Sequence, residues 1–246
     1  MHKKVCEILG LIGQPQSPIR PTELYNEGWM LRLLLEWAQH SATHGHPLFF
    51  EPQASWFSEA LLPSQFLARH RGDPLAETWT NADGVMGHFT IGNTGKGDLT
   101  VLPTATQFTV IEAKMFSGLS SGTKRAPNFH QAARNVACIA EVLSRANRAP
   151  SSFSILAFYV FAPASQINKG VFGSKVTRDD IYDKVKERTK SFGGEKDVWF
   201  TEWFIPTLER IQLQLYPWED VIHDLDQEYM DFYENCLRYN QGRLKN

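Results

Sequence analysis

Two apolar segments on either side of a helix-like segment constrain the fold most. Residues 155–161 (ILAFYVF) are apolar throughout, which is typical of a strand covered on both faces of a sheet. Residues 108–115 are also strand-like, and residues 128–143 between the two segments carry apolar side chains at helical spacing. The order strand, helix, strand predicts a right-handed crossover. The fold class is therefore expected to be α/β.

The remaining segments complete this prediction. Further strands are expected at 85–91, 98–102 and 211–216, and helices at 22–40 (capped by Thr22), 179–190 and 227–239. Residues 41–80 suggest only helix fragments and loops. We expect a mixed central sheet, an antiparallel meander plus a parallel crossover strand, flanked by helices. Without repeats or long linkers, residues 1–246 are expected to form a single domain, with a helical N-terminal segment and an acidic helical C-terminal extension.

Composition excludes several classes of protein. The 246 residues are 42% hydrophobic, which is enough for a full core. Three cysteines do not suggest a disulfide framework, Glu7 interrupts the apolar N-terminal stretch, and the longest apolar run is too short to span a bilayer. We therefore expect a cytoplasmic protein without a membrane partner. The net charge of −2 argues against a constitutively basic nucleic-acid coat.

Two carboxylates mark the most informative stretch. If residues 98–102 and 108–112 pair as a hairpin centred on Ala105, Asp98 lies directly opposite Glu112. Their Cβ atoms would be about 5 Å apart, and like charges at that separation repel. Lys114 shares a face with Glu112 because side chains alternate along a strand. The pattern predicts that Lys114, a divalent metal, or both hold the two acids together.

Two other polar residues fall near this stretch. Glu27 lies at the centre of an apolar stripe on the first long helix, where a carboxylate needs a partner unless the helix start keeps it wet. Gln131 lies near the start of the helix that follows Lys114, so it could reach back to the end of that strand. It belongs to a mostly polar stripe on that helix with Arg134, Asn135 and Cys138. A solvated surface is the default interpretation of such a stripe, and Gln131 alone indicates nothing.

The Asp followed by Glu-x-Lys after an apolar run resembles the PD-(D/E)XK nuclease superfamily, the restriction-endonuclease-like group. The resemblance extends from Glu27 to about residue 162, although Gly97 rather than Pro precedes Asp98. It implies that Asp98 and Glu112 bind Mg²⁺ or Mn²⁺ with help from the Ala113 carbonyl. It also implies that Lys114 orients or deprotonates the attacking water, with Glu27 and Gln131 as accessory catalytic residues.

The expected function is a metal-dependent nuclease, a DNA endonuclease in the simplest case. Hard carboxylate oxygens select Mg²⁺, which activates water and offsets charge on a phosphodiester under attack. Lys124, Arg125 and Arg134 are the predicted phosphate contacts, although simple solubility explains them about as well. A homodimer or a partner protein could supply selectivity.

Two alternatives remain at this point. The same fold could serve as a catalytically inactive nucleic-acid-binding or assembly module. Residues 118–122 formally match GxSxG around Ser120, with Asp220 and His223 downstream, as in a serine hydrolase, but a Ser/Gly loop matches this pattern easily. His40 and His44 have helical spacing without a second ligand pair, so we interpret them as surface or capping residues.

Overall fold

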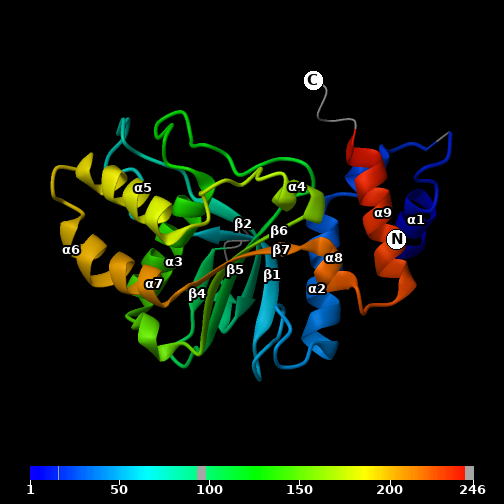
Figure 1. The fold of residues 1–246 in the computed structure, drawn as a ribbon, viewed down its shortest axis with the longest axis horizontal. Helices are drawn as coiled ribbons and strands as arrows, with labels where there is room; N and C mark the ends of the chain where they lie inside the picture. Colours follow the sequence, from blue (N-terminus) through cyan, green and yellow to red (C-terminus); the bar gives the residue numbers. More distant parts are fainter. Residues whose placement is uncertain (16, 93–97, 242–246) are drawn as a thin grey trace.

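The computed structural model describes residues 1–15, 17–92 and 98–241. A mixed five-stranded sheet with the order β1-β2-β5-β6-β7 forms the centre of this described part (Figure 1). A separate two-stranded sheet contains β3 and β4. The strands are β1 (Ser55–Leu62), β2 (Thr80–Gly87), β3 (Phe89–Ile91), β4 (Leu99–Val101), β5 (Gln107–Ala113), β6 (Ile155–Ala162) and β7 (Gln212–Pro217).

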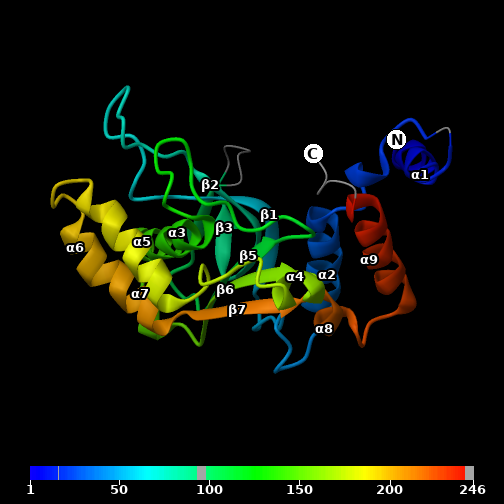
Figure 2. The same cartoon turned by 45° about the horizontal axis from the view of Figure 1, so that its top comes forward.

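Helices flank the sheet on both sides (Figures 1 and 2). One group, which includes α3, α5, α6 and α7, lies at the opposite end of the picture from α1, α2, α8 and α9. The helices are α1 (His2–Leu9), α2 (Glu27–Ser41), α3 (Gln131–Ala146), α4 (Ala164–Asn168), α5 (Arg178–Lys190), α6 (Asp197–Trp199), α7 (Ile205–Arg210), α8 (Trp218–Ile222) and α9 (Gln227–Asn240). Short 3-10 turns cover Pro21–Glu23 and Pro150–Ser152, and a π-helical turn, Phe200–Phe204, joins α6 to α7.

Strand β5 joins the two halves of the sheet. It is antiparallel to β2 and parallel to β6, which is in turn parallel to β7. Phe108 and Val110 pack in the same apolar cluster as α3, whereas Ile111 and Ala113 pack in the cluster that contains α2. Side chains on β5 therefore alternate between a face covered by α3 and a face covered by α2.

The predicted mixed sheet with flanking helices and a β5–α3–β6 crossover between parallel strands is confirmed. Strand β1 is a correction, because residues 41–80 were expected to hold only helix fragments and loops. The first long helix begins at Glu27 rather than near Thr22, because the Asn26 side chain accepts a hydrogen bond from Trp29 N and caps it.

The predicted hairpin between residues 98–102 and 108–112 is wrong. Strand β4 pairs with β3 instead, so a short hairpin is inserted between β2 and β5. The chain leaves β2 at Gly87, whose φ is +132° and where a Cβ would overlap the Gln107 carbonyl. His88 then accepts hydrogen bonds at Nδ1 from Thr106 N and Gln107 N, which fixes the base of the inserted hairpin.

The acidic C-terminal helix α9 packs against the start of α2. Asn240 Nδ2 donates to Tyr25 O at 2.7 Å, and the Tyr25 ring lies 5.1 Å from that of Phe232. Trp218 and Tyr233 are buried in the core, so packing accounts for these two aromatic side chains. Within the described ranges, no helix combines the length and the apolar character needed to cross a bilayer.

Candidate functional site

Glu112 is the buried centre of the site. Only 1% of its side chain is exposed at the end of β5. Lys114 Nζ lies 2.5 Å from Glu112 Oε1, and Gln131 at the start of α3 donates to the same oxygen. Asn135, one turn further along α3, donates to Glu112 Oε2 at 3.2 Å. Both carboxylate oxygens are therefore held by side chains of β5 and α3.

Asp83 on β2 is the second acid of the site. The antiparallel register pairs Gly84 with Ile111, and one further step along it brings Asp83 level with Glu112. Asp83 Oδ2 accepts a hydrogen bond from Ala113 N at 2.8 Å. The Asp83 side chain thus satisfies a backbone N–H at the end of β5. Asp83 is half-buried, whereas Glu112 is buried. The pair thus has one inner and one outer carboxylate.

The electrostatics of the pair follow from this arrangement. Burial, together with repulsion from Asp83, raises the pKa of Glu112 to about 8, although Lys114 acts in the opposite direction. Burial acts to lower the pKa of Lys114, but attraction to Glu112 and Asp83 outweighs burial and raises it. The two acids repel each other in a partly dry site, and the ammonium group of Lys114 compensates this repulsion.

Two further acids lie around the pair. Glu27 is half-buried in the first turn of α2, and its charge contributes to raising the pKa of Lys114. Glu59 on β1 is level with Asp83 and exposed, and it forms an ion pair of 3.5 Å with Arg32 on α2. Burial and repulsion from Asp83 raise the pKa of Glu59, against the attraction of Arg32. Arg32 thus partly neutralises this outer acid.

The donor set suits a hard divalent cation. Mg²⁺ is commonly held by one or two carboxylates, with waters and substrate phosphates completing its shell. Asp83 and Glu112 supply two carboxylates side by side, and Lys114 already places a positive charge against them. Across residues 1–15, 17–92 and 98–241, no three His, Cys, Asp or Glu side chains gather as a complete metal site. Solvent and substrate would have to supply the remaining ligands.

Asp98 does not lie opposite Glu112, which corrects its predicted place in the site. An isolated bridge joins it to Leu61 on the edge of β1 that faces away from β2, so both β1 and β2 lie between Asp98 and β5. Its carboxylate lies against Gly92, where a Cβ would overlap it. The geometric reason for choosing Asp98 as a metal ligand is therefore lost. Gly97, which precedes it, lies outside the described residues.

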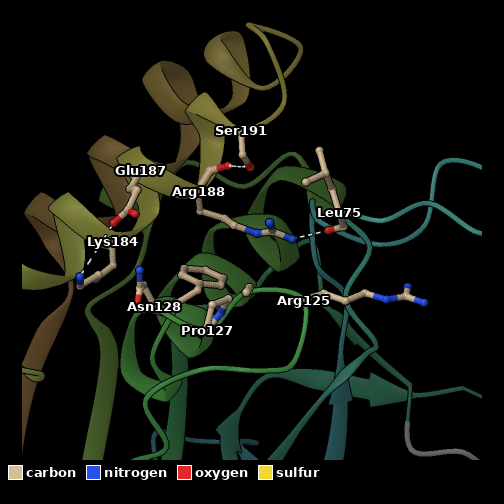
Figure 3. A pocket seen from close by; sticks show the side chains of 10 residues that line it. Leu75, Arg125, Pro127, Asn128, Lys184, Glu187, Arg188 and Ser191 are labelled. Atoms are coloured by element: carbon tan, nitrogen blue, oxygen red, sulfur yellow. Dashed lines mark hydrogen bonds and ion pairs between the residues drawn. The ribbon is translucent and has the colours of Figure 1, made fainter.

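The predicted phosphate contacts lie in different places. Arg134 Nη2 lies 3.4 Å from Ser120 Oγ, one turn along α3 from Gln131. Arg125 lines a separate pocket of about 190 Å³, where Figure 3 shows Arg188 reaching to the Leu75 carbonyl while the Arg125 side chain points away from α5. Lys124 is exposed in the loop before α3. Of these three residues, only Arg134 therefore lies near Glu112.

The serine-hydrolase pattern has a different geometry from a nucleophile elbow. Ser120 lies in the long loop between β5 and α3, and its backbone N–H donates to Gln131 Oε1 at 3.2 Å. His223 is 80% exposed, and its Nδ1 lies 2.7 Å from Asp224 Oδ1. His40 is likewise exposed and lies 3.6 Å from Glu36, as expected of a surface residue.

Two residues of the site were missed by the sequence prediction. Asp83 comes two residues before the predicted strand 85–91. An acidic residue just ahead of that strand was the signal that the sequence offered. Asn135 was visible only as part of a polar stripe on α3. Both are identified by their contacts with β5.

Comparison of the chain with protein-family models, with curated proteins and with solved structures gives no match.

Proposed function

We propose that this protein is a metal-dependent nuclease that hydrolyses phosphodiester bonds in DNA, with a restriction-endonuclease-like core. The observation that supports this proposal most is the convergence of Asp83, Glu112 and Lys114 at the end of two adjacent strands. The same three residue types in the same relation were predicted from the sequence, but with Asp98 in the place of Asp83. The proposal now depends on Asp83.

Asp83 and Glu112 would hold Mg²⁺, with the Ala113 carbonyl assisting as the resemblance to PD-(D/E)XK nucleases implies. When bound, the ion would lower the pKa of a water molecule and offset negative charge on the phosphate under attack. Gln131 and Asn135 fix the orientation of the Glu112 carboxylate. Lys114 would orient the attacking water and stabilise the charge that develops on the phosphate oxygens.

The binding-module alternative explains less of this arrangement. A protein that only binds phosphates gains nothing from two carboxylates side by side, because they repel the phosphate. Here Glu112 is kept almost fully buried beside Asp83 by two amide side chains and a lysine. Burying one acid beside another lowers stability unless the site has a cationic partner.

The test is cleavage of plasmid and linear DNA in Mg²⁺ or Mn²⁺ and in EDTA. We expect metal-dependent cutting by the wild-type protein and its loss in Lys114→Ala and Glu112→Gln. Binding of DNA without any metal-dependent cutting would favour the inactive module. Hydrolysis of a small ester that is lost in Ser120→Ala would favour the serine hydrolase.

A further inference from the structure

A hollow of about 210 Å³ lies directly beside the Glu112 site. Gln131 belongs to both, because its side chain lines the hollow and donates to Glu112 Oε1. One water occupies about 30 Å³ in the liquid, so the hollow has room for a planar group the size of a single nucleobase but not for a duplex. Because the hollow adjoins the Glu112 site, a group attached to a substrate bound at Glu112 could enter it.

Trp79 forms one wall of the hollow and is 41% exposed. Arg145 lies over its ring, with the guanidinium carbon 6.0 Å from the ring centre. With Arg145 over one face of the ring, the other face of the indole could serve as a platform on which a nucleobase of any identity stacks. Trp79 precedes β2, only four residues before Asp83, so the platform and the carboxylates share one stretch of chain.

Arg134, which also lines the hollow, provides a positive charge. Among the residues that the structure describes, its buried Nε has no hydrogen-bond partner, and Nη2 makes a long contact of 3.4 Å with Ser120 Oγ. Glu77 also lines the hollow, but its buried carboxylate forms an ion pair of 3.2 Å with Arg188. The charge of Arg134 also acts on Glu77, where it opposes the rise in pKa that burial causes. Arg188 is the first charge that compensates Glu77, so Arg134 can still attract an anionic oxygen in the hollow.

We propose that this hollow binds an unpaired nucleotide next to the scissile phosphate, with its base on Trp79 and a phosphate oxygen on Arg134. The inference rests on the proposed nuclease function and narrows the substrate to nucleic acid with a single-stranded segment. A base inside a duplex is stacked and paired, so its face cannot reach Trp79 unless the base is displaced. Asn81 and Thr123, which also line the hollow, offer polar groups to the edge of the base.

The experiment measures binding of a fluorescent single-stranded DNA oligonucleotide, and of the matching duplex, to the full chain carrying Lys114→Ala. We expect tighter binding of the single strand, and a Kd about tenfold higher or more when Trp79→Ala is added. Trp79→Phe should keep most of the affinity because it retains a ring. Arg134→Gln should weaken binding of the single strand and reduce its salt dependence, with a smaller effect on the duplex.

The matched control is Trp29→Ala. Trp29 is equally exposed, at 41%, and also lies under an arginine, Arg32, but it belongs to α2. If Trp29→Ala and Trp79→Ala weaken binding equally, or if Trp79→Ala leaves the Kd unchanged while its circular dichroism is native, the inference is overturned. If the wild-type protein cuts DNA in a metal-dependent way but Trp79→Ala does not change the Kd, the nuclease proposal stands and the proposed nucleotide site does not. Binding that depends on Trp79 without any cutting would refute the nuclease proposal but keep the hollow as a nucleotide site.

Discussion

Asp83 and Glu112 lie level with each other on the antiparallel strands β2 and β5, and Asp83 accepts the N–H of the residue that follows Glu112. This pairing brings a half-buried and a buried acid together at one end of the sheet. Lys114 and α3 side chains then fix the inner acid. The proposed chemistry depends on this relationship.

Divalent metal should stabilise the folded protein. A ligand at a hundred times its Kd adds about 2.7 kcal/mol to the free energy of unfolding, which corresponds to roughly 5–10 °C in Tm for a chain of this size. We expect such a rise with Mg²⁺ or Mn²⁺ in a thermal melt, and its loss in Asp83→Asn. Glu36→Gln, at an exposed acid of α2, should keep the full rise. An equal rise in both variants would place the metal elsewhere.

Gln131→Ala should lower the cleavage rate about 10- to 100-fold while the protein stays folded. The reason is that Gln131 orients Glu112 without being a predicted metal ligand. Single-turnover kinetics at several metal concentrations measure the effect, and excess metal should restore part of the rate. Gln227→Ala is the control, since that amide contacts Asp231 on the surface of α9. An unchanged rate in Gln131→Ala would show that Glu112 does not need this contact.

Stability should fall in acid through Asp73. The Arg69 guanidinium, which donates to both Asp73 oxygens, holds the pKa of this carboxyl well below its usual range. A depressed pKa contributes stability above the unfolded-state value, and that contribution is lost as the pH falls below about 4. Urea unfolding at neutral and acid pH should show that Asp73→Asn is less stable at pH 7 and less sensitive to acid. Glu23→Gln, in an exposed pair with Arg20, should change neither property.

Gly87→Ala should be strongly destabilising, because a Cβ there would overlap the Gln107 carbonyl and φ is +132°. Gly72→Ala is the matched control, with φ of +82° and open space around it, and should cost only about 1–2 kcal/mol. Chemical unfolding of both variants measures the difference. Similar losses would mean that the turn out of β2 tolerates a side chain.

The sequence was most informative where the pattern was local. The apolar runs of β5 and β6 and the helical spacing of α3 predicted a parallel crossover, and strand alternation placed Glu112 and Lys114 on one face. These features depend on neighbours within a few residues, and the structure agrees with them.

The pairing of the strands could not be predicted from such local patterns. A mirror-symmetric hairpin between residues 98–102 and 108–112 is plausible by spacing, but the inserted β3–β4 hairpin pairs β4 elsewhere. Long-range contacts of Gly87 and His88 with residues 106 and 107 fix the base of the inserted hairpin, and no local pattern reveals them. The same long-range pairing hid Asp83 as the partner of Glu112.

The most direct test compares Asp83→Asn with Asp98→Asn in a metal-dependent DNA cleavage assay. Both variants remove one negative charge with almost no change in volume, and thermal melts of each show whether the fold is kept. We predict that Asp83→Asn abolishes cutting and that Asp98→Asn leaves it largely intact. Loss of cutting in Asp98→Asn, with Asp83→Asn still active, would contradict the pairing of Asp83 with Glu112 as the centre of the site.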